Sequence, residues 1–181
     1  TCSLKSADDP AGTLTVPPSV VYENTAYTVT AIGNSAFADC RRLVALLIPT
    51  TVKAIGREMA RGCSALKIVE LGDGLTELGD EAFVGCSSLE KVVLSDGLAT
   101  VPRRAFYGDS SLREIHLGKA TASVGTQAFD GCTAITSVVC MAPAPPATAA
   151  YAFDPTALSE ATLTVPEGCR AAYAAKPVWG D

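Results

Sequence analysis

Apolar residues return along this chain in a fixed pattern, L-x-x-L-x-L, where L stands for an aliphatic residue or Cys. Five copies begin at Leu43, Leu66, Leu89, Leu112 and Ile135, each 23 residues after the last. The final two apolar positions of a copy lie two residues apart, so their side chains share one side of an extended strand. We therefore predict one short strand per copy, with the strands stacked as a parallel sheet.

A second recurring segment follows each strand after a turn and carries an Ala-Phe pair, as in Ala82-Phe83 and Ala105-Phe106. One copy differs, because Met59 stands at the Ala position and Ala60 at the Phe position. Exchanging the large and the small residue conserves the total volume. We predict that this segment crosses the back of each coil as a short turn of helix with its Phe in the core. Here a coil is one full turn of the chain.

A period of 20–29 residues with apolar residues at constant phase is typical of leucine-rich-repeat solenoids. We predict a single domain over residues 1–181, a β-rich, right-handed solenoid of about seven coils including capped ends. Residues 1–33 are expected to form an N-terminal cap coil with an inserted hairpin, and residues 34–141 the regular 23-residue coils. Residues 142–181 are expected to form an irregular coil and the C-terminal cap.

The two ends carry their own signals. Alternating segments on either side of Glu23-Asn24 predict the hairpin. A Pro-rich excursion at residues 142–148 is expected to leave the sheet, because Pro cannot donate a backbone hydrogen bond. A short helix at 167–175 and the single Trp179 are expected to finish the C-terminal cap.

Composition narrows the function classes. The net charge is −5 and no basic cluster occurs, so the footprint of a nucleic-acid-binding protein is missing. No apolar run approaches the length of a membrane span. No signal peptide is visible, but the chain opens abruptly at Thr1, as a trimmed chain would. We expect a monomer.

Four of the seven cysteines share one phase of the repeat, and Asp109 interrupts their series. Side chains in one phase stack about 4.8 Å apart on neighbouring strands, and their parallel direction gives poor disulfide geometry. Zinc is disfavoured because there is no CxxC and only one His. We therefore predict buried free thiols that act as small apolar residues. The four cysteines are Cys40, Cys63, Cys86 and Cys132.

The repeat Leu78-Gly79-x-x-Ala82-Phe83-x-x-Cys86-x-x-Leu89 resembles the BspA-like (Treponema pallidum type) leucine-rich repeats. The ending from Thr162 to Tyr173, followed by Trp179, is similar to the terminal segment of such proteins in Bacteroides-type gut bacteria. The resemblance implies an exported, cell-surface or extracellular protein. It also implies adhesion to a host, matrix or other bacterial surface protein. The family offers no catalytic residues to carry over.

Candidate chemistry is scarce. His116 is the only histidine, and its strand phase points it outward, next to Glu114. No second metal ligand stands in register with it, and no Ser or Cys is placed to complete a triad. We therefore expect no enzyme activity, no metal and no cofactor.

The outward strand positions are the candidate binding surface, on what we expect to be the concave side of the solenoid. Exposed apolar groups set among charges can mark a partner site. The alternative is that β-branched residues stand here only because they favour strands. The candidate residues are Leu47, Glu70, Val93, His116 and Val139 in one column, with Ile68, Lys91 and Glu114 in the next.

These observations predict a non-catalytic protein-binding or adhesion module. The alternative is a structural spacer without a ligand, inside a longer surface protein. A second open alternative places the binding site on the Pro-rich excursion, because protruding loops on rigid scaffolds often carry function.

Overall fold

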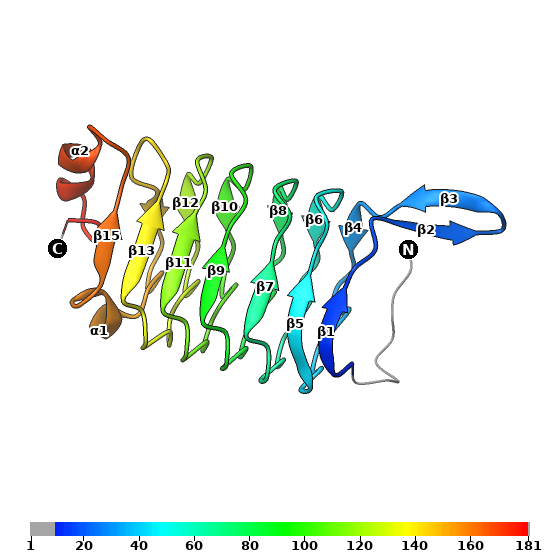
Figure 1. Ribbon diagram of the computed structural model, residues 1–181. Coiled ribbons are helices and arrows are strands. Elements are labelled where there is room, and N and C mark those ends of the chain that lie inside the picture. Colours follow the sequence, from blue (N-terminus) through cyan, green and yellow to red (C-terminus); the bar gives the residue numbers. More distant parts are fainter. Residues whose placement is uncertain (1–9, 181) are drawn as a thin grey trace.

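The computed structural model describes residues 10–180 and shows coils stacked in one row (Figure 1). Seven strands form a parallel sheet along this row, in the order β1-β5-β7-β9-β11-β13-β15. The predicted leucine-rich-repeat solenoid is thereby confirmed, with about six turns. The strands of this sheet are β1 Gly12–Thr15, β5 Leu43–Leu47, β7 Ile68–Glu70, β9 Lys91–Val93, β11 Glu114–Leu117, β13 Ser137–Cys140 and β15 Thr162–Thr164.

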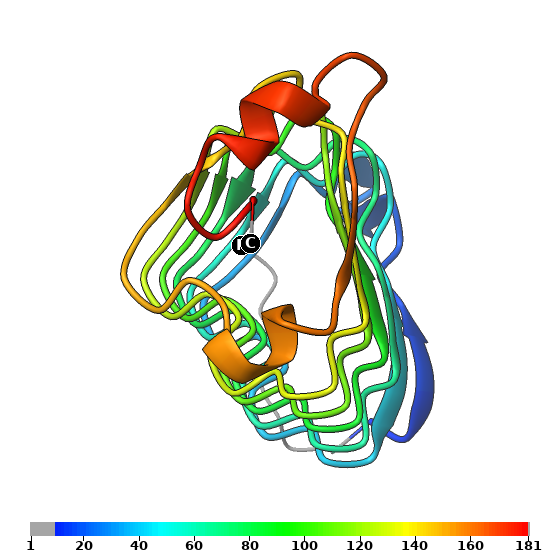
Figure 2. The ribbon, with the colours of Figure 1, turned by 90° about the vertical axis from the view of Figure 1, so that its left-hand side faces the viewer.

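Side chains alternate across this sheet, as the two-residue period requires. In β11, Ile115 and Leu117 are buried in the core, whereas Glu114 and His116 are half-buried on the outside. We call the outer surface of the seven-stranded sheet the sheet face. Viewed along the row, successive coils have similar outlines, each displaced somewhat from the last (Figure 2).

Two smaller parallel sheets form on another side of the coils, from the second apolar pair of each repeat. The Pro-rich excursion is shorter than predicted, because its last two residues, Ala147 and Thr148, pair with Ser123 and Val124. The strands are β4 Ala31–Ile32, β6 Ala54–Ile55 and β8 Glu77–Leu78 in one sheet, and β10 Thr100–Val101, β12 Ser123–Val124 and β14 Ala147–Thr148 in the other.

The Ala-Phe segments are turns and not the short helices that we predicted. Each contains a non-glycine residue with positive φ, for example Glu81 at 60° and Arg104 at 53°. A left-handed residue cannot continue a right-handed helix. The backbone bonds the next coil instead: the Phe83 N–H donates to the Ala105 carbonyl at 2.8 Å. These turns therefore add a second set of hydrogen bonds between coils. Helix is confined to the C-terminal part of the described chain.

The phenylalanines of successive coils form an aromatic column inside the solenoid. Phe83, Phe106, Phe129 and Phe153 stack with ring centroids 5.2–5.3 Å apart. Trp179 packs edge-on against Phe153 at 5.5 Å and ends the column. The column stops below Phe83 because the preceding coil has Ala60, which is buried beside the equally buried Met59. The Phe residues are therefore core, as predicted.

The predicted cysteine ladder is present. Cys40, Cys63, Cys86 and Cys132 are buried free thiols. Cys63 Sγ donates to the Phe37 carbonyl at 3.0 Å, and Cys132 Sγ to the Phe106 carbonyl at 3.0 Å, each 26 residues back. Burial raises the pKa of the Cys86 and Cys132 thiols well above the ordinary value. These thiols are therefore protonated and poorly nucleophilic.

We expect the four ladder cysteines to resist alkylation in the native protein at pH 7, and to react fully in denaturant. Cys169 lies only half-buried and serves as the internal positive control. Peptide mass mapping after a short pulse of iodoacetamide makes the measurement. Rapid native labelling of the ladder, or a disulfide among its members, would contradict it.

The predicted hairpin is formed by β2 (Ser19–Tyr22) and β3 (Thr25–Thr28). It extends beyond the first coil, away from the row (Figure 1). All of its strand residues except Val20 are exposed, so the hairpin itself buries little against the first coil. The role of residues 1–33 as a cap stays a prediction, as do the other boundaries, and residues 1–9 lie outside the described chain.

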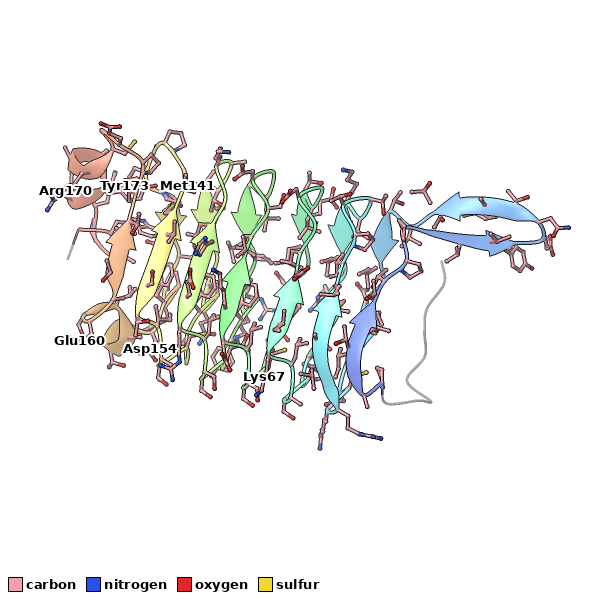
Figure 3. The ribbon with its side chains drawn as sticks, in the orientation of Figure 1. Lys67, Met141, Asp154, Glu160, Arg170 and Tyr173 are labelled. Carbon is pink, nitrogen blue, oxygen red and sulfur yellow. The ribbon has the colours of Figure 1, made fainter. Side chains whose placement is uncertain are left out.

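The C-terminal end is held by α1 (Pro155–Leu158) and α2 (Arg170–Ala174), the latter within the predicted helical stretch. Figure 3 shows Arg170 and Tyr173 at this end of the row. The Tyr173 hydroxyl donates to the Ala142 carbonyl at 2.8 Å, and Trp179 Nε1 to the Pro146 carbonyl at 2.8 Å. The Pro-rich segment is therefore tied to the C-terminal segment rather than free.

Candidate functional site

The sheet register brings the predicted binding residues into columns. Ile68 pairs with Lys91, and Lys91 with Glu114, so the first column runs unbroken across three coils. The second column is in two parts. Leu47 pairs with Glu70 on one side, and Val93, His116 and Val139 pair in sequence on the other. No registered pair joins Glu70 to Val93, although both are described.

Two aliphatic side chains in the middle of the sheet face are exposed among charged neighbours. Ile68 is 52% exposed and Val93 is 47% exposed. Leu47 and Val139, at the ends of the second column, are half-buried. Of the apolar candidates from the sequence, Ile68 and Val93 therefore offer the most surface to a partner.

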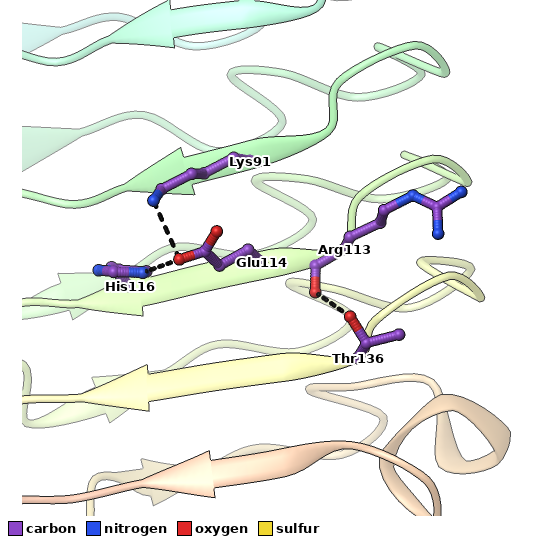
Figure 4. Close-up of polar contacts among 5 residues, drawn as sticks. All are labelled: Lys91, Arg113, Glu114, His116 and Thr136. Atoms are coloured by element: carbon purple, nitrogen blue, oxygen red, sulfur yellow. Dashed lines mark hydrogen bonds and ion pairs between the residues drawn. The ribbon is translucent and has the colours of Figure 1, made fainter.

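Charged groups on the sheet face partly neutralise one another. Lys91 Nζ lies 2.9 Å from Glu114 Oε1, and His116 Nε2 bonds the same carboxylate oxygen (Figure 4). The Lys91 hydrogen bond, with that of His116, lowers the pKa of Glu114 below its ordinary value. Beside this group, the Thr136 hydroxyl bonds the Arg113 carbonyl at 3.3 Å (Figure 4). The Glu114 carboxylate is therefore already paired within the sheet face and is not a free anion.

A shallow groove of about 290 Å³ lies between β7 and β9 on the sheet face. Four of the eight predicted residues line it, whereas Leu47, His116, Val139 and Glu114 do not. Sequence reasoning missed Lys67 and Val69. Lys67, at the base of β7 in Figure 3, immediately precedes an outward strand position, and that adjacency was the available signal. The groove residues are Lys67, Ile68, Val69, Glu70, Lys91 and Val93.

Among residues 10–180, the side-chain partner of His116 is Glu114, and no hydroxyl or thiol bonds the ring. Within residues 10–180, no cluster of three or more His, Cys, Asp or Glu is arranged to hold a metal ion. No helix in this part of the chain is long and apolar enough to span a membrane.

Two solved structures show the same architecture. The Treponema pallidum leucine-rich-repeat protein TpLRR is 29% identical, with a TM-score of 0.65, over 70% of this chain and 57% of that one. A leucine-rich-repeat protein from Bacteroides ovatus is 28% identical, with a TM-score of 0.56, over 70% of this chain and 39% of that one. The match thus spans less than two thirds of either structure.

Among curated proteins, none matches the sequence. The family model for the BspA type leucine rich repeat region matches residues 30–159 in six copies. This range contains the regular coils, the aromatic column as far as Phe153, and the whole groove on the sheet face. The chain therefore belongs to the BspA type leucine-rich-repeat family.

Proposed function

We propose that this chain is a non-catalytic protein-binding module of an exported or cell-surface protein, and that its sheet face binds the partner. The observation that carries the proposal is the exposed pair Ile68 and Val93 around a groove, on a sheet whose inner side already supplies the core. Contiguous exposed apolar surface rimmed by polar groups is typical of interaction sites. Membership of a repeat family that generally mediates protein interactions supports the same proposal.

The Pro-rich alternative has less support. Carbonyls of Ala142, Pro143, Ala144 and Pro146 accept hydrogen bonds from the C-terminal segment. A segment tied down in this way has few free backbone groups to offer a ligand. The sheet face, in contrast, has no other part of residues 10–180 packed over its middle.

Replacing Val93 and His116 together by Asp should abolish capture of surface or matrix proteins by the chain without unfolding it. Both side chains point away from the core, so the fold should tolerate the change. In a complex the two Asp carboxylates would be buried side by side against an apolar partner, which strongly opposes binding. The measurement is a pull-down, quantified by mass spectrometry, with circular dichroism as the folding check.

Ala99→Asp with Ala122→Asp is the matched control. These residues are exposed in neighbouring coils, beside the small sheet of β10 and β12 and away from the sheet face. Capture should survive this change. If both double variants retain every partner, the sheet face is not the binding surface; if the wild type captures nothing specific, the chain is a spacer.

A further inference from the structure

The seven-stranded sheet is continuous, but its pairing is weakest between β7 and β9, where the Glu90 N–H also reaches the Lys67 carbonyl at only 3.5 Å. These strands share one registered pair, Ile68 with Lys91, whereas β5–β7 and β9–β11 each share three. The Ile48 N–H donates to the Glu70 carbonyl at 2.9 Å, and the Leu94 N–H to the His116 carbonyl at 2.9 Å. At the equivalent position no bond joins the Leu71 N–H to the Val93 carbonyl, although both residues are described.

The weak pairing between β7 and β9 is explained by the turns that follow these strands. A Cβ added at Gly74 would lie 2.0 Å from the Thr50 carbonyl oxygen, so this coil presses against the one before it. A Cβ at Gly97, the same position one coil later, would lie 3.4 Å from the Leu75 oxygen, an ordinary contact. Ser95 also places its hydroxyl between the coils, on the Asp73 carbonyl at 2.9 Å. The turn after β7 therefore lies closer to the coil before it than the turn after β9 does.

We call the weakly paired boundary between β7 and β9 the seam. The groove described above lies at the seam, and it combines two kinds of recognition group. Ile68 and Val93 give it exposed aliphatic walls. Lys67, Glu70 and Lys91 add charged side chains beside these walls. At about 290 Å³ the groove is at the small limit of pockets that hold whole drug-sized ligands. It fits one side chain of a longer molecule better.

The charges at the groove are of opposite sign at its two ends. Lys67 precedes β7 and Glu70 ends it, about 10 Å apart along an extended strand. Neither side chain has an ion pair among residues 10–180, whereas Lys91 is engaged by Glu114. A uniformly charged polymer would be repelled at one end. A peptide with one acidic and one basic residue would be attracted at both.

We propose that the seam groove binds an extended peptide segment of the protein partner. An aliphatic side chain enters between Ile68 and Val93, with an acidic residue at Lys67 and a basic residue at Glu70. This inference rests on the proposed function, because it specifies what the sheet face recognises. It adds the location, between β7 and β9, and the chemistry of the segment.

Three synthetic peptides of equal length test the charge pattern. Each carries a central Leu between two charged residues three positions apart: one acidic and one basic, both acidic, or both basic. The complete ¹⁵N-labelled chain is titrated with each peptide and followed by NMR. The mixed peptide should bind about three- to tenfold tighter than the others, as two surface ion pairs allow. The largest amide shifts should fall at residues 67–71 and 90–94.

Charge variants give the sharper result, because they do not depend on the direction in which the peptide runs. Lys67→Glu should move the preference to the basic peptide, and Glu70→Lys to the acidic peptide. Ile68→Asp should weaken the mixed peptide at least about tenfold by placing a charge on the apolar wall. Ala122→Asp, exposed beside β12 and away from the sheet face, should leave its affinity unchanged.

Equal affinity for all three peptides, no change of preference in the charge variants, or shifts centred outside the seam would overturn the inference. The proposed function fails separately. If Lys67→Glu and Glu70→Lys leave partner capture intact while Val93→Asp with His116→Asp abolishes it, the sheet face binds the partner. The seam groove then does not determine which partner is bound. If the latter variant also retains its partners, the sheet-face proposal itself is wrong.

Discussion

Phe106→Ala should lower the free energy of unfolding by about 3–5 kcal/mol, the usual loss for removing a buried Phe from a packed core. The ring is fully buried and stacks on both sides, 5.3 Å from Phe83 and 5.2 Å from Phe129. Its removal would interrupt the column in the middle of the array. Because each coil is stabilised by its neighbours, the loss weakens coils on both sides. Urea unfolding followed by circular dichroism measures the change.

Two variants complete the test. Phe83→Ala should also destabilise clearly, but less than Phe106→Ala, because Phe83 stacks on one ring only and has Ala60 in the preceding coil. Lys67→Ala, at an exposed position, should change the free energy of unfolding by no more than about 0.5 kcal/mol. Equal effects of Phe106→Ala and Lys67→Ala would mean that the inward face has been misassigned.

The strands, their stacking and the buried Phe positions could be predicted because they depend on two periods that the sequence displays directly. A two-residue alternation gives the inside and outside of a strand, and a 23-residue repeat gives its neighbour. Ile115, His116 and Leu117 illustrate this, since phase alone placed the first and last inside and the middle one outside.

The Ala-Phe crossing could not be predicted in the same way. Its left-handed residues include Glu81 and Arg104, and neither residue type favours positive φ. The conformation is imposed by hydrogen bonds between coils, such as Phe83 N–H to Ala105 O, which are invisible in one copy of the repeat. Local composition therefore suggested helix where tertiary contacts dictate turns.

The seam between β7 and β9 could not be predicted from the sequence either. Gly72-Asp73-Gly74 and Ser95-Asp96-Gly97 look alike as turn segments. Their difference lies in how closely each turn approaches the coil before it. The candidate site was therefore predicted as a line of residues, whereas the structure divides that line between Glu70 and Val93.

Asp109 occupies the cysteine phase of its coil and is the most unusual buried group among the described residues. Its side chain is fully buried, and neither carboxylate oxygen has a hydrogen-bond partner. Burial raises the pKa of Asp109 well above the ordinary carboxyl value, and nearby backbone N–H groups of Cys86 and Gly85 only partly oppose this. Ladder thiols donate to the carbonyl 26 residues back, as Cys86 does to Ala60. We expect a protonated Asp109 to donate to Phe83 in the same way.

The pH dependence follows from linkage. The folded state holds the Asp109 proton more tightly than the unfolded state, whose carboxyl pKa is about 3.9. The stabilisation from Asp109 is therefore fully present below about pH 4, and it is lost as the pH rises toward the folded-state pKa. Asp96 and Glu114 have lowered pKa values and act in the opposite direction, so the wild-type curve alone mixes both effects.

Asp109→Asn removes this proton while keeping the shape of the side chain and a donor for the Phe83 carbonyl. The variant should match the wild type near pH 4 and become more stable than it as the pH rises. The difference should grow by about 1.4 kcal/mol per pH unit for as long as folded Asp109 stays protonated. Asp109→Cys, which restores the ladder residue, should likewise exceed the wild type at pH 7. Urea unfolding from pH 4 to pH 8 makes the measurement; parallel curves for wild type and Asp109→Asn would show that Asp109 is ionised and solvated in the folded protein.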